Sequence, residues 1–183
     1  MILPIYVYGN PILRKIAKPI SEDYPDLKDL VNNMYETMYH ADGVGLAAPQ
    51  IGLPIRLLVI DLAPLKKEDP ELGNFKITMI NPTILEQSSD LVSGEEGCLS
   101  IPGIHENVLR PRKIKINYFD IDFNEYTEEF EDYKARVVQH EYDHLEGHLF
   151  TDKINPLRRQ LLKSKLTGIS KGKTPCNYQI KIV

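Results

Sequence analysis

The sequence predicts a single α+β domain in which antiparallel strands pack around a central helix that carries HEYDH, with a further N-terminal and a C-terminal helix. Its 183 residues, 42% of them hydrophobic, suffice for one core of ordinary size. Strand-like segments dominate, and they do not alternate regularly with helices as in a doubly wound sheet. No repeat, low-complexity tract or linker divides the chain, so residues 1–183 form one predicted domain that includes the basic segment 153–183.

The first helix is predicted over residues 26–41, where apolar side chains recur at helical spacing: Leu27, Leu30, Val31, Met34 and Met38. Pro25 and Asp26 are typical of a helix start, and Gly43 is typical of a stop. An apolar stripe of this width indicates a face packed on the core.

Strands are predicted next, at residues 55–61 and 76–86, and the polar segment PLKKEDPELGN between them is predicted to be an exposed loop. Residues 113–123 alternate as a further strand. The alternation changes phase at Tyr118 and Phe119, which predicts a bulge or a strong twist there.

The remaining elements follow in close succession. The residues FNE predict a hairpin turn before a strand at residues 126–130. Helices are predicted from Asp132 to Gly147, through HEYDH, and from about Pro156 to Thr167. The final residues NYQIKIV predict a short strand.

The composition and the N-terminal residues indicate where in the cell the protein is expected. The N-terminal segment MILPIYVYGN lacks a basic leader, and the longest apolar run has only four residues, so we expect neither a signal peptide nor a membrane span. Cys98 and Cys176 stand outside any CxxC pair, which indicates no disulfide framework and favours the cytoplasm. A net charge of −4 argues against DNA or a generic nucleic-acid partner.

The segment QHEYDH holds a candidate metal site. His140 and His144 lie one helical turn apart, about 6 Å along the axis, so both imidazoles can reach one ion. Two ordinary histidines on a helix are the alternative, but Glu141 between them favours a metal site.

Two familiar third ligands are missing from the sequence. No glutamate follows Glu146, and Phe150 stands where the longer HExxHxxGxxH pattern has its third histidine. His148 lies too far along the helix from His140, so we expect it to end the helix with a polar partner. Cys98 remains as a candidate, in a glycine-containing stretch that would let backbone approach a metal, although a lone cysteine is usually a small buried hydrophobe.

Three motifs occur together: GVGLAAPQIG at residues 43–52, EGCLS at residues 96–100 and QHEYDH at residues 139–144. In this order and at this spacing they resemble peptide deformylases, over roughly residues 2 to 165. The resemblance implies a cytoplasmic hydrolase that removes the N-formyl group from the N-terminal formylmethionine of nascent polypeptides and releases formate.

The resemblance also assigns the metal ligands. It implies that Cys98, His140 and His144 bind one divalent ion, with Fe2+ as the working ion and Zn2+, Ni2+ or Co2+ as possible substitutes. Three protein ligands leave a fourth position open, which is typical of a catalytic site.

The same resemblance names the catalytic groups. Glu141 is implied to be the general acid and base. The side-chain amide of Gln50 and the backbone N–H of Leu99 are implied to stabilise the oxyanion that forms on the formyl carbon.

Substrate contacts are expected beside these groups. Gly43 and Gly45 would let the substrate backbone lie close, although a tight turn explains them equally well, and Val44 and Val137 suit an apolar methionine pocket. Arg136 departs from the aliphatic residue of many relatives, and we expect it to snorkel, covering the pocket with its methylenes.

His105 is a second departure, since many relatives have an arginine there that contacts the peptide backbone. Two other kinds of protein remain open. A metallopeptidase that cuts internal amides would not use Cys98 as a ligand, and a non-catalytic metal-stabilised binding module would need Cys176 to close a four-ligand site.

The C-terminal segment is basic, whereas the rest of the chain is acidic. Residues 153–183 hold eight basic and no acidic side chains, whereas the other 152 residues hold 14 basic and all 26 acidic ones. A solvated helix face would explain this, and so would weak ribosome contact, in which the helix from Pro156 and the lysines after it bind RNA phosphates. We expect the final residues to fold back as a strand over part of this basic surface.

Overall fold

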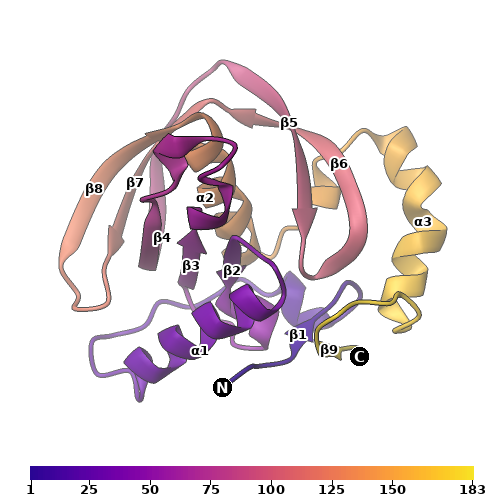
Figure 1. Cartoon of the computed structure of the whole chain (residues 1–183), viewed down its shortest axis with the longest axis horizontal. Coiled ribbons are helices and arrows are strands. Elements are labelled where there is room, and N and C mark those ends of the chain that lie inside the picture. The colour runs from indigo at the N-terminus through magenta and orange to yellow at the C-terminus, as the bar shows by residue number, and fades with distance from the viewer.

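Three α-helices and nine strands make up the structure, a computed structural model that describes all 183 residues. In chain order they are β1 (Ile5–Tyr6), α1 (Leu27–His40), β2 (Gly45–Ala47), β3 (Leu57–Asp61), β4 (Lys76–Gln87), β5 (Leu91–Cys98), β6 (Ile101–Pro111), β7 (Lys113–Phe119), β8 (Glu125–Glu131), α2 (Asp132–Leu145), α3 (Pro156–Ser170) and β9 (Ile180–Lys181). Figure 1 shows α2 in the middle of the molecule, α1 below it and α3 at one side. The predicted α+β class is confirmed.

The largest sheet is antiparallel and has the order β2-β3-β4-β7-β8. The run LLVI in β3 is apolar throughout because both faces of this sheet are covered. Leu58 and Ile60 pack in the cluster that includes side chains of α2, whereas Leu57 and Val59 pack in the cluster that includes side chains of α1. Alternate residues of one strand therefore join the sheet to two helices.

Helix α2 lies between the large sheet and a separate antiparallel hairpin, β5–β6. It contacts β2, β3, β7 and β8 on one side and β6 on the other. Enclosure on both sides buries nine of its residues, including His140, Glu141 and His144. The position of α2 therefore places the HEYDH residues inside the protein.

The two ends of the chain meet in a third, parallel sheet, in which β1 pairs with β9. Ile5 lies opposite Ile180, and Tyr6 lies opposite Lys181. Both termini lie on the same side of the molecule (Figure 1). The predicted C-terminal strand is confirmed, and it folds back onto the N-terminal segment.

The predicted helices and the strands 55–61, 76–86 and 126–130 are confirmed with small shifts at their ends. At the start of α3, the Asn155 side chain accepts a hydrogen bond from the Leu157 N–H at 2.9 Å. The predicted loop at residues 64–74 contains two short 3-10 turns, at Ala63–Leu65 and Pro70–Leu72. No helix has the length and apolar character needed to cross a membrane.

The irregularity predicted near Tyr118 and Phe119 is present, but its extra residue lies in β4 and not in β7: the register shifts between the pairs Ile80–Phe119 and Thr83–Asn117. Strand β7 ends at Phe119, its pairing with β8 is regular, and the hairpin turn occupies residues 120–124 instead of beginning at FNE. The irregular register lies between β4 and β7, where Asn81 has a φ of 51°. The Asn81 side chain bonds both the N–H and the carbonyl of Ile20, so this bulge joins the strand to the segment before α1.

Candidate active site

The three predicted metal ligands meet at one point. The Cys98 Sγ and ring nitrogens of His140 and His144 all lie within 4.8 Å of one another, and His144 Nε2 lies 3.3 Å from the sulfur. Donor atoms on one tetrahedral ion are separated by roughly 3.5 Å, so these side chains fit a metal of the zinc or iron type. Cys98 ends β5, whereas the histidines lie one turn apart on α2.

A carboxylate orients the first histidine. Glu96 Oε2 lies 2.8 Å from Nδ1 of His140, which leaves Nε2 for the metal side. Burial alone would raise the pKa of Glu96, but hydrogen bonds from Arg110 and His140 hold it well below its usual range. Arg110 also binds Asp143 of α2 at 2.9 Å, so β6 and α2 share one buried ion network.

Glu141 faces the same space from α2 and lies against Gly45 of β2. The residue is 4% exposed, and burial raises the pKa of its carboxyl group to about 7. Its Oε2 atom is buried and has no hydrogen-bond partner in the protein. A carboxyl group of this kind can exchange protons near neutral pH and has an oxygen available for a bound group.

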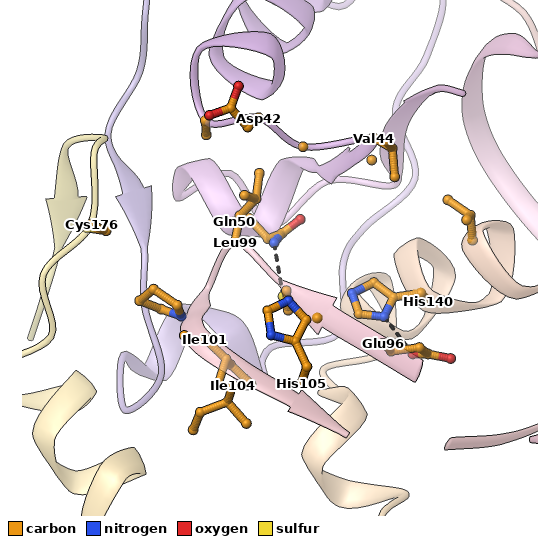
Figure 2. Close-up of a pocket in the computed structure, with 18 of the residues that line it drawn as sticks. Asp42, Val44, Gln50, Glu96, Leu99, Ile101, Ile104, His105, His140 and Cys176 are labelled. Carbon is orange, nitrogen blue, oxygen red and sulfur yellow. Dashed lines mark hydrogen bonds and ion pairs between the residues drawn. The ribbon is translucent and has the colours of Figure 1, made fainter. Parts of the chain in front are cut away.

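Gln50 points its amide towards the sulfur. Its Oε1 accepts a hydrogen bond from the Ala47 N–H at 2.8 Å, which fixes the orientation of the side chain. The Nε2 atom then lies 3.5 Å from Cys98 Sγ and 3.2 Å from Ser100 Oγ. Figure 2 shows Gln50 and His140 at the site, Gln50 from the short 3-10 turn at residues 48–51 and His140 from α2.

Leu99 lies in the two-residue turn that joins β5 to β6. Its backbone N–H donates to no other group of the protein. The Gln50 amide and this N–H are therefore two donors beside the candidate metal ligands.

The cleft beside these groups has a volume of about 560 Å³. It is lined by all of the predicted substrate-binding residues, Gly43, Val44, Gly45 and Val137, and by Glu141, Gln50, Leu99, Cys98 and His140. His144 lies behind the cleft wall at 1% exposure. The structure thus brings together every residue predicted for the site.

Arg136 lines the cleft, as expected, but its guanidinium does not reach water, as snorkelling would require. The residue is 8% exposed, and its guanidinium donates to Glu96 and to the carbonyl oxygens of Val92, Gly94 and Val108. It therefore turns into the β5–β6 hairpin, where these acceptors satisfy the charge in place of water.

Two other histidines flank the site without joining it. His105 lies at the rim of the cleft, with its ring close to the Cα of Gly97. His148 is exposed and its ring forms no hydrogen bond or ion pair, so the predicted polar contact is absent.

Several cleft residues were not predicted from the sequence. Tyr133 of α2 and Ile101 and Ile104 of β6 form part of its wall, as does the C-terminal segment 175–178. Glu96, the partner of His140, had a possible signal, since it is an acidic residue two positions before Cys98. No local pattern marks the distant C-terminal segment.

Known proteins resemble this chain along most of its length. The model of the polypeptide deformylase family matches residues 2–160. A peptide deformylase of Flavobacterium psychrophilum is 50% identical over 190 residues, covering 100% of this chain and 98% of its own. One from Cytophaga hutchinsonii is 47% identical over 181 residues, covering 99% and 97%.

Solved structures agree with these relatives. A peptide deformylase of Arabidopsis thaliana has a TM-score of 0.84 at 39% identity, covering 93% of this chain and 90% of its own. One from Thermotoga maritima has a TM-score of 0.77 at 44% identity, covering 85% and 99%. With a match in sequence and fold over nearly the whole chain, the protein belongs to the peptide deformylase family.

Proposed function

We propose that Cys98, His140 and His144 hold the single metal ion with which this chain, a peptide deformylase, removes the formyl group from N-terminal formylmethionine. The observation that carries this assignment is the meeting of one thiol and two imidazoles within 4.8 Å beside a buried carboxyl group. A divalent ion in such a site polarises a carbonyl group and makes water acidic near neutral pH. The family resemblance favours Fe2+, and the same ligands also suit Zn2+, Ni2+ and Co2+.

Glu141 transfers the proton in this proposal. Deformylation splits one amide with one water, giving formate and a free amine, so a proton must move from the water to the leaving nitrogen. The pKa of about 7 for Glu141 suits a group that first accepts this proton and then donates it. Its unpartnered Oε2 supports that role.

Gln50 and Leu99 stabilise the oxyanion. The amide of Gln50 is held in one orientation by the Ala47 N–H, and the N–H of Leu99 has no partner within the protein, so both donors are available to an oxyanion. Preorganised donors of this kind each lower a barrier by about 2.7 to 4 kcal/mol.

The methionine side chain enters the apolar part of the cleft. Val44, directly before β2, and Val137 of α2 line it, and Gly43 and Gly45 belong to the same wall, along which the backbone of the nascent chain would lie. Both cysteines are free thiols, which supports action in the reducing cytoplasm, where formylated chains are made.

The basic C-terminal segment adds a proposed partner. Lys153, Arg158 and Arg159 already pair with acidic groups of the body. Lys163, Lys165, Lys171 and Lys173 are exposed and form no ion pair, which supports a weak, salt-sensitive contact with ribosomal RNA.

The experiment that tests the function is formate release from formyl-Met-Ala-Ser by protein loaded with ferrous iron under anaerobic conditions. We expect turnover of the formylated peptide and no cleavage of the same peptide without formyl. Cys98→Ala should lose the metal, whereas Cys176→Ala should retain it. Metal-replete protein that releases no formate contradicts the function, and full metal occupancy in Cys98→Ala contradicts the ligand assignment.

A further inference from the structure

Two hydrogen bonds hold the turn that follows Cys98. The turn consists of Leu99 and Ser100, between the ends of β5 and β6. The Tyr8 N–H donates to the Ser100 carbonyl at 2.8 Å, and the Tyr178 hydroxyl donates to the Leu99 carbonyl at 2.7 Å. Both carbonyl groups of the turn are therefore bonded to residues outside the hairpin.

Both donors lie next to the sheet formed by the chain ends, Tyr8 two residues after β1 and Tyr178 two residues before β9. Beside Tyr8, the Ile5 N–H bonds the Gln179 carbonyl at 2.9 Å, and the Val7 N–H bonds the Lys181 carbonyl at 3.1 Å. Residues around Tyr8 and Tyr178 are thus fastened to each other as well as to the turn. The family model ends at residue 160, so the segment that carries Tyr178 lies beyond the part of the chain that it matches.

The C-terminal segment also reaches the cleft itself. Residues 175–178 line the cleft together with Leu99 and Asp42, and the Asn177 side chain donates to the Asp42 carboxylate at 3.2 Å. Tyr178 is half-buried, and burial raises the pKa of its hydroxyl, so this group stays protonated and remains a donor. Figure 2 shows the β1–β9 pair bordering the site, with Cys176 on this side.

We propose that Tyr178 is a positioning residue for deformylation, whose hydroxyl holds the Leu99 carbonyl and thereby keeps the Leu99 N–H directed into the cleft. The N–H and the carbonyl of Leu99 belong to the two peptide planes that meet at its Cα. Only φ and ψ of Leu99 link these planes, and the pairing of Cys98 with Ile101 closes the turn, so a bond that fixes the carbonyl plane limits the rotations left to the N–H plane. A donor acts on an oxyanion best when it needs no reorganisation. This inference rests on the proposed role of Leu99.

The kinetic test compares Tyr178→Phe with Tyr118→Phe, both as metal-loaded full-length protein. Each change removes one tyrosine hydroxyl that donates to a protein oxygen, but Tyr118 bonds Glu128 in the β7–β8 part of the large sheet. With formyl-Met-Ala-Ser, we expect kcat per bound metal to fall about three- to tenfold in Tyr178→Phe, with KM changed by less than about twofold. Tyr118→Phe should match the native enzyme.

A rise in KM at constant kcat would overturn the inference, because Tyr178 would then only contribute to substrate binding as a residue that lines the cleft. Equal kcat in the native enzyme and Tyr178→Phe would overturn it as well.

A second measurement does not depend on activity. In zinc-loaded protein, 15N relaxation of the Leu99 amide reports how firmly the turn is held, and we expect its order parameter to fall from about 0.85 towards 0.6 in Tyr178→Phe but not in Tyr118→Phe. An unchanged order parameter contradicts the positioning role even if kcat falls. If the native enzyme releases no formate, the proposed function fails, while the relaxation result still decides whether Tyr178 holds the turn.

Discussion

The carboxylate of Glu141 lies so close to Gly45 that a Cβ atom at position 45 would be 2.3 Å from its Oε1. Gly45 pairs with Ile60 in the large sheet, so its backbone cannot move away without breaking strand pairing. The glycine in GVGL therefore leaves the space that the carboxylate of Glu141 needs. Substrate approach and turn geometry, the two explanations available from the sequence, both omit this contact.

Gly45→Ala should consequently displace the carboxylate. We expect kcat to fall by about tenfold or more, since proton transfer needs a heavy-atom distance of about 2.6 to 3.2 Å. Metal content should stay at the native level. Gly168→Ala is the control, because a Cβ there meets only Thr174 at 4.0 Å and its activity should be native. Native kcat in Gly45→Ala would show that the carboxylate tolerates another position.

Glu141→Gln tests the proton-transfer role directly. The amide keeps the shape of the side chain but cannot accept the proton, so kcat should fall by about 10² to 10⁴ while the metal remains bound. Steady-state formate release and metal analysis of the same sample measure both quantities. Glu146→Gln, at the end of the same helix, removes the charge that pairs with Arg56 and should leave turnover nearly unchanged. Near-native turnover in Glu141→Gln is incompatible with the proposed role.

The sequence predicts the local part of this site well. Histidines four residues apart must share a helix face, so the relation of His140 to His144 needed no tertiary information. Cys98 is different, because its approach to these histidines depends on how β5 packs beside α2. Spacing alone left the third metal ligand open, and the resemblance of three motifs to one family identified it as Cys98.

The β5–β6 hairpin was missed for a physical reason. Its inward positions include Glu96 and Arg110, which are buried as an ion pair instead of apolar side chains. Polar residues at inward positions erase the alternation by which strands are predicted. Such exceptions to core patterning are expected in segments that end beside a functional site, and β5 ends at Cys98, one of the proposed metal ligands.

Asp152 provides a test of acid stability away from the metal ligands. Burial alone would raise the pKa of Asp152, but hydrogen bonds from Arg14 and the Leu149 N–H outweigh this and lower it. Because an unfolded aspartate titrates near 3.9, the stabilisation is complete above about pH 4 and is lost as the pH falls through the lower folded value.

Asp152→Asn should therefore lower the free energy of unfolding at pH 7 by about 1 kcal/mol, and the difference from the native protein should shrink as the pH falls below about 4. Urea unfolding of both proteins across this range measures the effect. Asp122→Asn is the matched control, because Asp122 pairs with Lys28 at an exposed position and should contribute little. A difference that grows towards acid pH would contradict the assigned sign.

The proposed ribosome contact depends on lysines that the fold leaves free. Arg158 binds Glu106 at 2.6 Å, so its removal would disturb β6 as well as the surface charge. A variant with alanine at Lys163, Lys165, Lys171 and Lys173 removes four charges without breaking an ion pair. Each phosphate contact releases condensed counterions, so affinity should fall steeply with salt and the slope of log K against log salt should become smaller in the variant.

Co-sedimentation with ribosomes across a salt series measures this slope. Alanine at Lys66 and Lys67, in the loop before β4, is a control that removes two exposed charges elsewhere on the surface. We expect this control to bind like the native protein and the four-lysine variant to bind more weakly at low salt, with formate release unchanged in all three. Identical binding and identical salt dependence in the native and four-lysine proteins would mean that the C-terminal charge serves only as a solvated helix face.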